Sequence, residues 1–116
     1  ICFSGDSSIL MNVQELATLA ELDLNVTIIV LDNKALGMVY KMQEKSYKKC
    51  YSQSVYKKPT DIAKVAEAFG IESRHLDYKL ILNCLENPEK VSKEISEFMF
   101  GKNHPVLIQC EIPKSW

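Results

Sequence analysis

The chain has 116 residues, of which 47% are hydrophobic, so it is long enough for one packed domain and too short for two. Its formal net charge of −1 shows no basic excess, which argues against a nucleic-acid partner and against a charged membrane surface. No apolar run approaches the roughly 18 to 20 residues that a membrane-spanning helix needs. The first residues show neither the basic lead nor the small-residue cleavage site of a secretory signal.

Strand-like and helix-like segments alternate along the chain. Residues 1–4 form a short apolar run, and residues 26–31 form a continuously apolar, β-branched run that is typical of a strand covered on both faces. Between them, apolar residues recur at helical spacing and predict one helix with the residues Met11, Leu16, Leu19, Ala20 and Leu22. Residues 36–49 predict a second helix, whose inward residues are Met38, Val39 and Met42.

The second half of the chain continues this alternation. Residues 60–70 predict a helix with Thr60 as its N-cap, Gly70 as its stop, and an inward face of Ile62, Val65, Ala66 and Phe69. A short strand is expected within residues 71–77. Pro88 opens another helix, which ends before Gly101 and has the inward residues Val91, Ile95, Phe98 and Met99. Residues 105–112 form a last strand.

The four cysteines are scattered and form no Cys-x-x-Cys pair; they are Cys2, Cys50, Cys84 and Cys110. This pattern favours reduced thiols in a cytoplasmic protein over a disulfide framework or a zinc site. The chain opens inside an apolar segment without an initiator methionine, and it stops just after a strand-like segment. We therefore expect a single domain, residues 1–116, that is a piece of a larger protein cut at both ends.

The order of the elements predicts an α/β fold: a three-layer α/β/α sandwich with a mostly parallel sheet that is incomplete in this chain. Right-handed crossovers place the carboxyl ends of all its strands at one edge, and ligands of open α/β sheets bind outside that edge. Two polar stretches, Gly5-Asp6-Ser7-Ser8 and Asp32-Asn33, each follow a strand and precede a helix. The edge of the sheet at these stretches is therefore the expected binding site.

The residue types at these two strand ends suit a metal-bound phosphate. A helix N-terminus offers free N–H groups and a partial positive charge. Asp6 and Asn33 add hard oxygen ligands, and Mg²⁺ prefers one or two protein oxygens together with phosphate oxygens. The sequence thus predicts an edge that can hold a diphosphate bridged to the protein by Mg²⁺.

Simpler interpretations stay open for each of these features. Taken alone, a Gly-Asp-Ser-Ser stretch is a helix cap and Asp-Asn is a turn. Taken alone, Met38 and Met42 are more often core filling than pocket residues. The lysines and interleaved tyrosines of residues 45–58 are typical of a solvated loop, although they also suit an anion site.

A strand followed by Gly-Asp-Ser also resembles the nucleophile element of GDS-type lipases and esterases, with Ser7 as the nucleophile. Those enzymes need a base, which they carry as Asp-x-x-His. Position 72 is Glu and position 101 is Gly, so neither His75 nor His104 has an Asp three residues before it. The two histidines also have no partner at a metal-ligand spacing, and the sequence disfavours this class.

Taken together with their spacing, the two stretches resemble the thiamine diphosphate motif, in which a Gly-Asp-Gly, Gly-Asp-Ala or Gly-Asp-Ser element is followed by Asn-Asn. Asn33 lies 27 positions after Asp6, within the range that this motif spans. Residues 11–33, 36–39, 69–71 and 104–112 are similar to the acetolactate synthase large subunit. The resemblance covers essentially the whole chain.

The resemblance implies a role for each residue of the site. Asp6 and Asn33 would bind Mg²⁺ by their side chains, and Ala35 by its backbone carbonyl. The implied cofactor-binding residues are Gly5, Asp6, Ser7, Ser8, Asn33, Ala35, Leu36, Gly37 and Met38. No catalytic side chain is implied here, because in the family the glutamate that activates the pyrimidine ring of the cofactor belongs to another domain.

Three residues depart from the pattern of the family. Ser7 replaces the second Gly of the motif, a position at which the backbone N–H does the binding. Asp32 replaces the first Asn, which is not the side-chain ligand of the metal, and brings additional negative charge. Met42 stands where acetolactate synthases usually carry a Trp that lines the substrate channel.

The resemblance implies a thiamine diphosphate- and Mg²⁺-dependent transferase in the cytoplasm that condenses 2-keto acids with decarboxylation, in branched-chain amino acid biosynthesis. It implies a homo-oligomer whose pyrimidine-binding domain comes from another subunit, with no nucleic-acid or membrane partner. FAD is a possible cofactor of the parent enzyme but would not bind this chain, which we expect to be inactive alone. Two alternatives stay open: another thiamine diphosphate-dependent decarboxylase or carboligase, and an inert α/β domain.

Overall fold

A computed structural model describes residues 1–114, apart from the side chains of residues 84, 85 and 90–92. Four strands form one sheet in the order β1-β2-β4-β3, and every neighbouring pair is parallel. The strands are β1 (Cys2–Gly5), β2 (Thr27–Asp32), β3 (Glu72–Leu76) and β4 (Val106–Glu111). The helices are α1 (Asp6–Met11), α2 (Glu15–Glu21), α3 (Gly37–Ser46), α4 (Ile62–Ala68), α5 (Tyr78–Glu86) and α6 (Pro88–Phe100). The predicted parallel α/β fold is confirmed.

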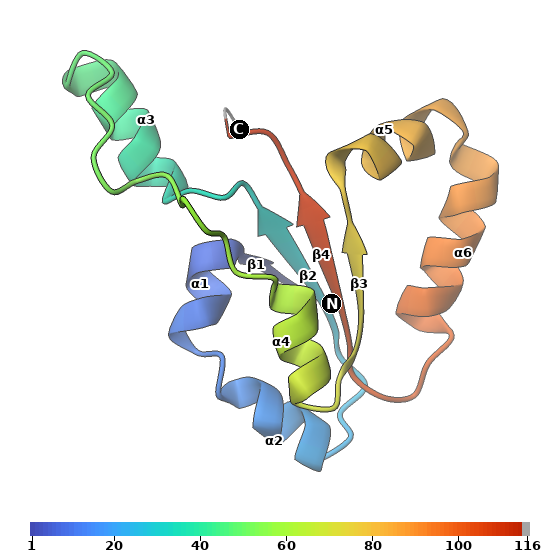
Figure 1. Ribbon diagram of the computed structural model, residues 1–116. Helices are drawn as coiled ribbons and strands as arrows, with labels where there is room; N and C mark the ends of the chain where they lie inside the picture. Colours follow the sequence, from blue (N-terminus) through green and yellow to red (C-terminus); the bar gives the residue numbers. More distant parts are fainter. Residues whose placement is uncertain (115–116) are drawn as a thin grey trace.

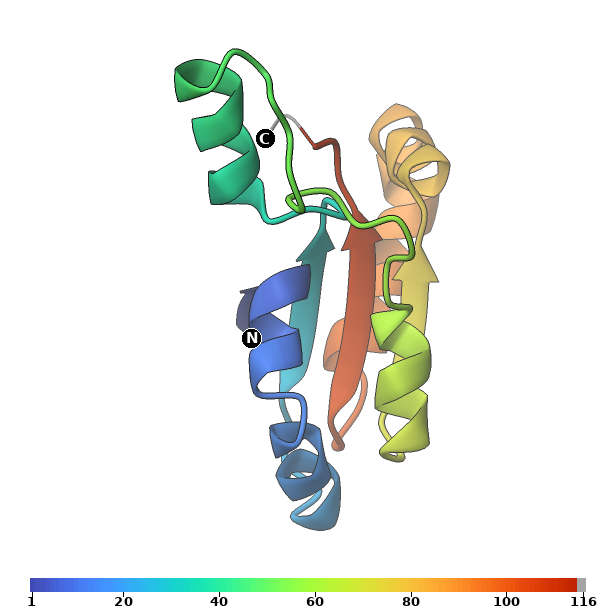
Figure 2. The same cartoon turned by 60° about the vertical axis from the view of Figure 1, so that its left-hand side comes forward.

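Helices cover the two faces of the sheet in separate groups. Figure 2 shows α1, α2 and α4 on one side of the strands and α5 and α6 on the other. Two apolar clusters correspond to these layers, because alternate residues of a strand point to opposite faces. The first consists of Ile9, Leu16, Ile28, Val30, Ile62, Ala66, Ile71 and Leu107. The second consists of Leu76, Phe98, Val106 and Ile108.

The second face is covered over β3 and β4 but less so toward β1. Phe3 is 68% exposed and Leu31 is 39% exposed, and both belong to the face on which α5 and α6 pack. The sequence-based expectation that residues 26–31 are covered on both faces is therefore wrong for the end of β2. The hydrophobic run of this strand reflects its central place in the sheet rather than complete burial.

The first predicted helix is two helices. α1 begins at Asp6 and ends at Met11, and α2 begins at Glu15, with hydrogen bonds between residues three apart across the turn between them. Asn12 ends α1, as expected of a side chain that competes with helical hydrogen bonds. Met11 and Leu22, expected inward, are 74% and 60% exposed, whereas Leu16 is buried.

The exposure of α3 corrects another expectation, that its apolar residues point inward. None of its residues is buried, and Met38, Val39 and Met42 are exposed rather than directed inward. The helix begins after the chain has left the sheet, and it extends beyond the carboxyl edge of the strands (Figure 1). Helical spacing alone could not predict this, because periodicity says nothing of what lies opposite the apolar face.

The later elements agree with the sequence except at two places. β3, α6 and β4 lie where they were expected, while α5 was not predicted and fills the gap between β3 and α6. Gly70 follows α4 with a φ of +83°, as the predicted stop requires. The predicted N-cap is wrong, because the side chain of Asp61 rather than Thr60 accepts the Lys64 N–H. The side chain of Val91 lies outside the described residues.

The N-cap of α4 gives a first prediction. Asp61→Ala should lower the free energy of unfolding by about 1 kcal/mol, because the first turn of α4 loses its side-chain acceptor. Thr60→Ala is the matched control and should change it by less than about 0.5 kcal/mol. Chemical denaturation near pH 7 measures both changes. A larger loss of stability for Thr60→Ala than for Asp61→Ala would show that Asp61 is not the N-cap.

The same cap should depend on pH. Burial raises the pKa of Asp61, but hydrogen bonds from Lys64 and its positive charge outweigh burial and leave the pKa below the usual 3.8. A lowered pKa stabilises the folded state above the unfolded value, and this stabilisation is lost as pH falls through the folded pKa. The stability difference between wild type and Asp61→Ala should therefore shrink below about pH 4. A difference that grows on acidification would contradict this.

Candidate functional site

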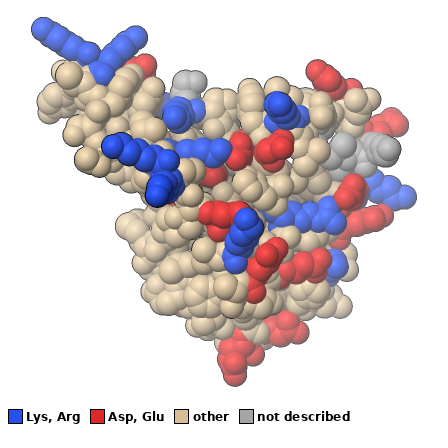
Figure 3. Space-filling model, in the orientation of Figure 1, with Lys and Arg blue, Asp and Glu red and all other residues tan. Residues whose placement is uncertain are grey.

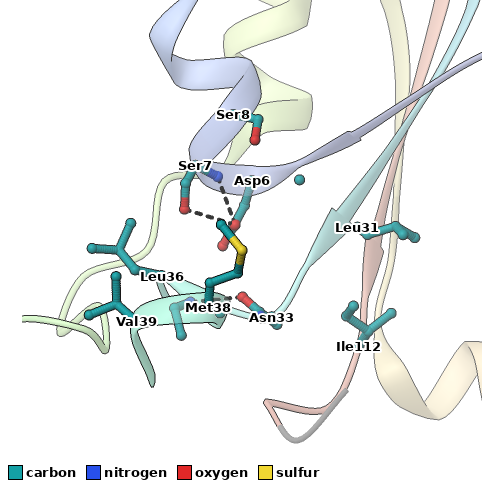
Figure 4. A pocket seen from close by; sticks show the side chains of 12 residues that line it. Asp6, Ser7, Ser8, Leu31, Asn33, Leu36, Met38, Val39 and Ile112 are labelled. Carbon is teal, nitrogen blue, oxygen red and sulfur yellow. Dashed lines mark hydrogen bonds between the residues drawn. The ribbon is translucent and has the colours of Figure 1, made fainter. Parts of the chain in front are cut away.

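A cavity of about 430 Å³ opens at the carboxyl edge of the sheet, beside the ends of β1 and β2. Figure 4 shows the side chains around it, which come from the start of α1, the end of β2, the β2–α3 connection, the first turn of α3 and the residue after β4. The lining residues are Gly5, Asp6, Ser7, Ser8, Leu31, Asn33, Ala35, Leu36, Gly37, Met38, Val39 and Ile112. This volume lies within the roughly 300 to 1,000 Å³ of ordinary ligand pockets.

Asp6 is the most unusual side chain of this cavity. It is the first residue of α1 and only 6% exposed. Its Oδ1 accepts hydrogen bonds from the N–H of Ser7 at 2.7 Å and from the hydroxyl of Ser7 at 3.2 Å. Its Oδ2 is buried and has no hydrogen-bond partner among the described residues. An unpaired buried carboxylate oxygen is costly, so it indicates a missing cation or donor.

The pKa of Asp6 is raised, first by burial and then by the neighbouring carboxylate of Asp32. The register of the sheet explains this proximity. Gly5 pairs with Leu31, so the residues that follow them, Asp6 at the start of α1 and Asp32 at the end of β2, lie at the same level of the sheet edge. Two carboxylates so placed repel each other, and a divalent cation would relieve that repulsion.

Asp32 is tied into the fold by hydrogen bonds to both oxygens. Its Oδ1 accepts the N–H of Lys34 at 2.9 Å, and its Oδ2 accepts from Nε2 of Gln109 at 2.8 Å. Gln109, buried on β4, accepts the Ala63 N–H at 2.9 Å through its Oε1. The side chain of Asp32 thus connects β2 with β4 and, through Gln109, with the first turn of α4. Both carboxylate oxygens of Asp32 thus accept a hydrogen bond, unlike Oδ2 of Asp6.

Asn33 lies in a tight turn against the start of α3. Its Oδ1 accepts the N–H of Ala35 at 3.1 Å, while Lys34 between them has a φ of +57°. A Cβ at Gly37 would lie 2.9 Å from Nδ2 of Asn33, so any other residue here would displace the Asn33 side chain. Asp32-Asn33 therefore forms a turn, as it predicts when taken alone, and this turn is also part of the cavity wall.

These residues fit a magnesium-bound diphosphate. Oδ2 of Asp6 has no donor, Oδ1 of Asn33 uses one of its two lone pairs, and Ala35 lines the same cavity. No group of three His, Cys, Asp or Glu side chains suited to a metal occurs within the described part of the chain. A cation here would therefore need phosphate oxygens to complete its shell, as Mg²⁺ commonly does.

The cavity brings together the nine residues that the sequence assigned to the cofactor, but not Met42. Met42 lies on α3, is 51% exposed and does not line the cavity. Three lining residues were missed: Leu31, Val39 and Ile112. Ile112 follows β4 directly, and its place after a strand end was a signal that the sequence already contained.

The geometry disfavours the serine hydrolase further. The hydroxyl of Ser7 contacts Asp6 and lies 2.6 Å from the hydroxyl of Tyr56. His75 is 3.2 Å from Glu111 and His104 is 2.9 Å from Glu72. Each histidine is therefore engaged with a glutamate. In the described part of the chain, Ser7 thus has no histidine base.

The carboxylate that His75 contacts also holds Lys34. Nζ of Lys34 lies 2.6 Å from Oε1 of Glu111, and this hydrogen bond, with the charges of both partners, lowers the pKa of Glu111. Lys34 follows the predicted metal ligand Asn33 directly. The ion pair therefore holds the ammonium group of Lys34 at the end of β4, whereas α1 follows β1.

The basic segment after α3 is a loop with internal contacts. The rings of Tyr40 and Tyr51 stack with centroids 4.4 Å apart, and Lys45, Lys48 and Lys49 are exposed. Figure 3 shows basic side chains gathered at the end of the molecule that α3 forms. The exposure of residues 45–53 agrees with the interpretation as a solvated loop, whereas Ser54 is buried.

No helix in the described part of the chain is both long enough and apolar enough to cross a membrane.

Comparison with known proteins shows the family of the chain. Residues 1–110 match the family model described as "Thiamine pyrophosphate enzyme, C-terminal TPP binding domain". The chain is 35% identical to a probable acetolactate synthase large subunit of Methanococcus aeolicus over 99% of its own length and 18% of that protein. It is 39% identical to the acetolactate synthase isozyme 1 large subunit of Escherichia coli over 97% of its length and 18% of that protein. The chain thus spans about a fifth of the relatives that it matches.

Solved structures show the same fold. A benzoylformate decarboxylase from Polynucleobacter necessarius superposes with a TM-score of 0.75 at 18% identity, over 97% of this chain and 19% of that one. A thiamine diphosphate-dependent 4-hydroxybenzoylformate decarboxylase from Rhodococcus jostii RHA1 gives 0.72 at 17% identity, over 96% and 19%. The match over residues 1–110 shows that this chain belongs to the C-terminal, thiamine pyrophosphate-binding domain family of thiamine pyrophosphate enzymes.

Proposed function

We propose that this chain binds the diphosphate of thiamine diphosphate through Mg²⁺, as one domain of an acetolactate synthase-like enzyme. The observation that carries the proposal is the buried Oδ2 of Asp6, which has no partner among the described residues and belongs to a cavity wall. Asp6 and Asn33 would bind the metal by their side chains, and Ala35 by its carbonyl oxygen. Membership of the family supports the cofactor, and the acetolactate synthase relatives support the class of enzyme.

The other walls of the cavity would orient the cofactor. Gly5, Ser7 and Ser8 lie at the start of α1, whose first backbone N–H groups have no carbonyl partner within the helix; that of Ser7 donates to Oδ1 of Asp6 instead. A diphosphate at this end would also meet the positive end of the helix dipole. Gly37 and Met38 lie at the first turn of α3, on the opposite wall.

Bound thiamine diphosphate would supply the carbon nucleophile with which the enzyme attacks a 2-keto acid and releases CO₂. The residues of this chain would anchor and orient it, and none of them is assigned a catalytic role. The exposed apolar residues of α3, among them Met38 at 88% exposure, support a partner surface there. We assign that surface to the pyrimidine-binding domain of another subunit in a cytoplasmic homo-oligomer. FAD has no assigned site in this chain.

A different thiamine diphosphate-dependent decarboxylase or carboligase is the second candidate, because the metal and diphosphate residues would be the same. The solved structures that share the fold are decarboxylases, but at 17% and 18% identity they support the fold alone. The acetolactate synthase relatives are 35% and 39% identical over almost the whole chain, and they favour the first candidate.

The metal ligand gives the direct test. In the full-length protein, Asp6→Asn should weaken Mg²⁺-dependent binding of thiamine diphosphate by more than roughly 100-fold, because a ligand loss exceeds the 10- to 100-fold typical of outer-shell changes. Isothermal titration with and without Mg²⁺ measures this.

The control is Asp23→Asn, the same change at an exposed residue in the loop before β2, at the opposite edge of the sheet. It should leave the affinity unchanged. Wild-type protein that binds no thiamine diphosphate, or Asp6→Asn protein that binds it normally, would contradict the proposal.

Catalysis should require more than this chain. We expect the 116-residue chain to form no acetolactate from pyruvate in the presence of Mg²⁺ and thiamine diphosphate, because it holds no residue that activates the cofactor. A colorimetric acetolactate assay with the full-length protein as the positive control measures this. Turnover by the chain alone at the usual enzymatic rates of about 1 to 10³ s⁻¹ would overturn the assignment.

Met42 gives a prediction about the substrate. In the full-length protein, Met42→Trp should raise the preference for 2-ketobutyrate over pyruvate and the sensitivity to sulfonylurea-type compounds, because a flat ring can stack where methionine cannot. The expected gain in the binding free energy of the larger keto acid or the inhibitor is roughly 0.5 to 1.5 kcal/mol, which is typical of one aromatic contact. Competition between the two keto acids measures it, with Met11→Trp, at an exposed methionine that ends α1, as the control. Equal product ratios in all three proteins would remove Met42 from the substrate channel.

A further inference from the structure

A short segment after the α3 loop, residues 52–56, lies against the β2–α3 connection. Gln43 of α3 holds its first residue: Nε2 donates to the carbonyl of Ser52 at 3.0 Å, and Oε1 accepts the Ser52 N–H at 3.3 Å. The same Oε1 accepts the hydroxyl of Ser54 at 2.5 Å, and Ser54 is buried completely. These bonds fix the segment against α3.

Backbone hydrogen bonds attach the segment to the turn that carries Asn33. The N–H of Leu36 donates to the carbonyl of Ser54 at 2.9 Å, and the N–H of Tyr56 donates to the carbonyl of Lys34 at 3.0 Å. Ala35 and Val55 thereby form an antiparallel bridge. Tyr56 consequently has a backbone position set by the same turn that lines the cavity.

The side chain of Tyr56 connects this turn to the start of α1. Its hydroxyl lies 2.6 Å from Oγ of Ser7, and Ser7 donates its only hydroxyl hydrogen to Oδ1 of Asp6 at 3.2 Å. When Ser7 gives its hydrogen to Asp6, the hydroxyl of Tyr56 is the donor to Ser7. The resulting chain runs from Tyr56 through Ser7 to the carboxylate of Asp6.

This chain of hydrogen bonds decides which oxygen of Asp6 is left unpaired. Oδ1 accepts two donors, the N–H and the hydroxyl of Ser7, and Oδ2 accepts none among the described residues. A carboxylate whose one oxygen is held in this way cannot rotate freely, so the other oxygen is presented in one direction. Ligating carboxylates in metal sites are usually held by such outer contacts.

We propose that Tyr56 is a positioning residue for the metal site: through Ser7 it holds the Asp6 carboxylate with Oδ2 directed to the cation. The inference rests on the proposed function, because it concerns the same metal. Tyr56 itself does not line the cavity, so it acts only through Ser7. This role also explains the hydroxyl of Ser7, which a glycine at the same position of the Gly-Asp-Gly motif would lack.

The test is a Mg²⁺ titration of the full-length protein at a fixed, saturating concentration of thiamine diphosphate, with cofactor binding as the readout. Tyr56→Phe removes only the donor and should raise the apparent Kd for Mg²⁺ roughly tenfold, the lower end for outer-shell contacts. Ser7→Ala should have a similar effect. The double variant should be no weaker than Ser7→Ala, because both changes break the same chain of hydrogen bonds.

Tyr51→Phe is the matched control, since Tyr51 belongs to the same loop and its hydroxyl donates to Glu44 at 3.4 Å instead of to the site. It should leave the Mg²⁺ affinity at the wild-type value. The melting temperature of each protein without cofactor is recorded in parallel. A Tyr56→Phe variant that melts earlier but binds Mg²⁺ like wild type would reduce the contact to a structural one and overturn the inference.

Failure of this inference and failure of the proposed function give different results. If wild type binds thiamine diphosphate with Mg²⁺ while Tyr56→Phe matches Tyr51→Phe, only the role of Tyr56 is wrong. If wild type shows no Mg²⁺-dependent binding, the proposed function is wrong and the role of Tyr56 with it. Additive effects of Ser7→Ala and Tyr56→Phe would also overturn the inference, because they would show two independent contributions.

Discussion

Two carboxylates, Asp6 and Asp32, lie side by side at the carboxyl edge of the sheet, and the rest of the site depends on how the fold accommodates them. β1 and β2 are parallel neighbours with Gly5 opposite Leu31, so Asp6 and Asp32 follow at the same level. Burial and mutual repulsion raise the pKa of Asp6. The fold satisfies Asp32 on both oxygens and Asp6 on only one. A cation at Oδ2 of Asp6 would compensate the negative charge that the protein leaves without a partner there.

The part of the domain away from the cavity keeps this edge in place. Gln109 links Asp32 to the first turn of α4, and Glu111 holds Lys34 at the end of β4. The segment of residues 52–56 fixes the turn between β2 and α3 from the other side. The positions of Asp6 and Asn33 are therefore set by three neighbouring elements rather than by their own turns alone. Such support is what a ligand site needs in order to be preorganised.

The sequence predicted the parts of this structure that local pattern determines. The alternation of strands and helices led to the parallel sheet, and the two polar strand ends led to the edge where the cavity lies. The exposure of Met38 and Met42 was not predictable, because no described residue buries the part of α3 that carries them. The split between α1 and α2 depends on a single turn at Asn12. The contact of Tyr56 with Ser7 joins residues 49 positions apart, and no periodicity indicates such a pair.

The central claim is that Oδ2 of Asp6, the side-chain oxygen of Asn33 and the carbonyl oxygen of Ala35 would hold a divalent cation that also binds a diphosphate. It is tested most directly by crystals of the full-length protein grown with thiamine diphosphate and Mn²⁺ in place of Mg²⁺, with the metal located by its anomalous scattering. The account predicts one strong anomalous peak within coordination distance of these three oxygens. A metal bound instead by Asp32 or by Glu111 and His75, or a bound cofactor without metal at Asp6, would contradict it.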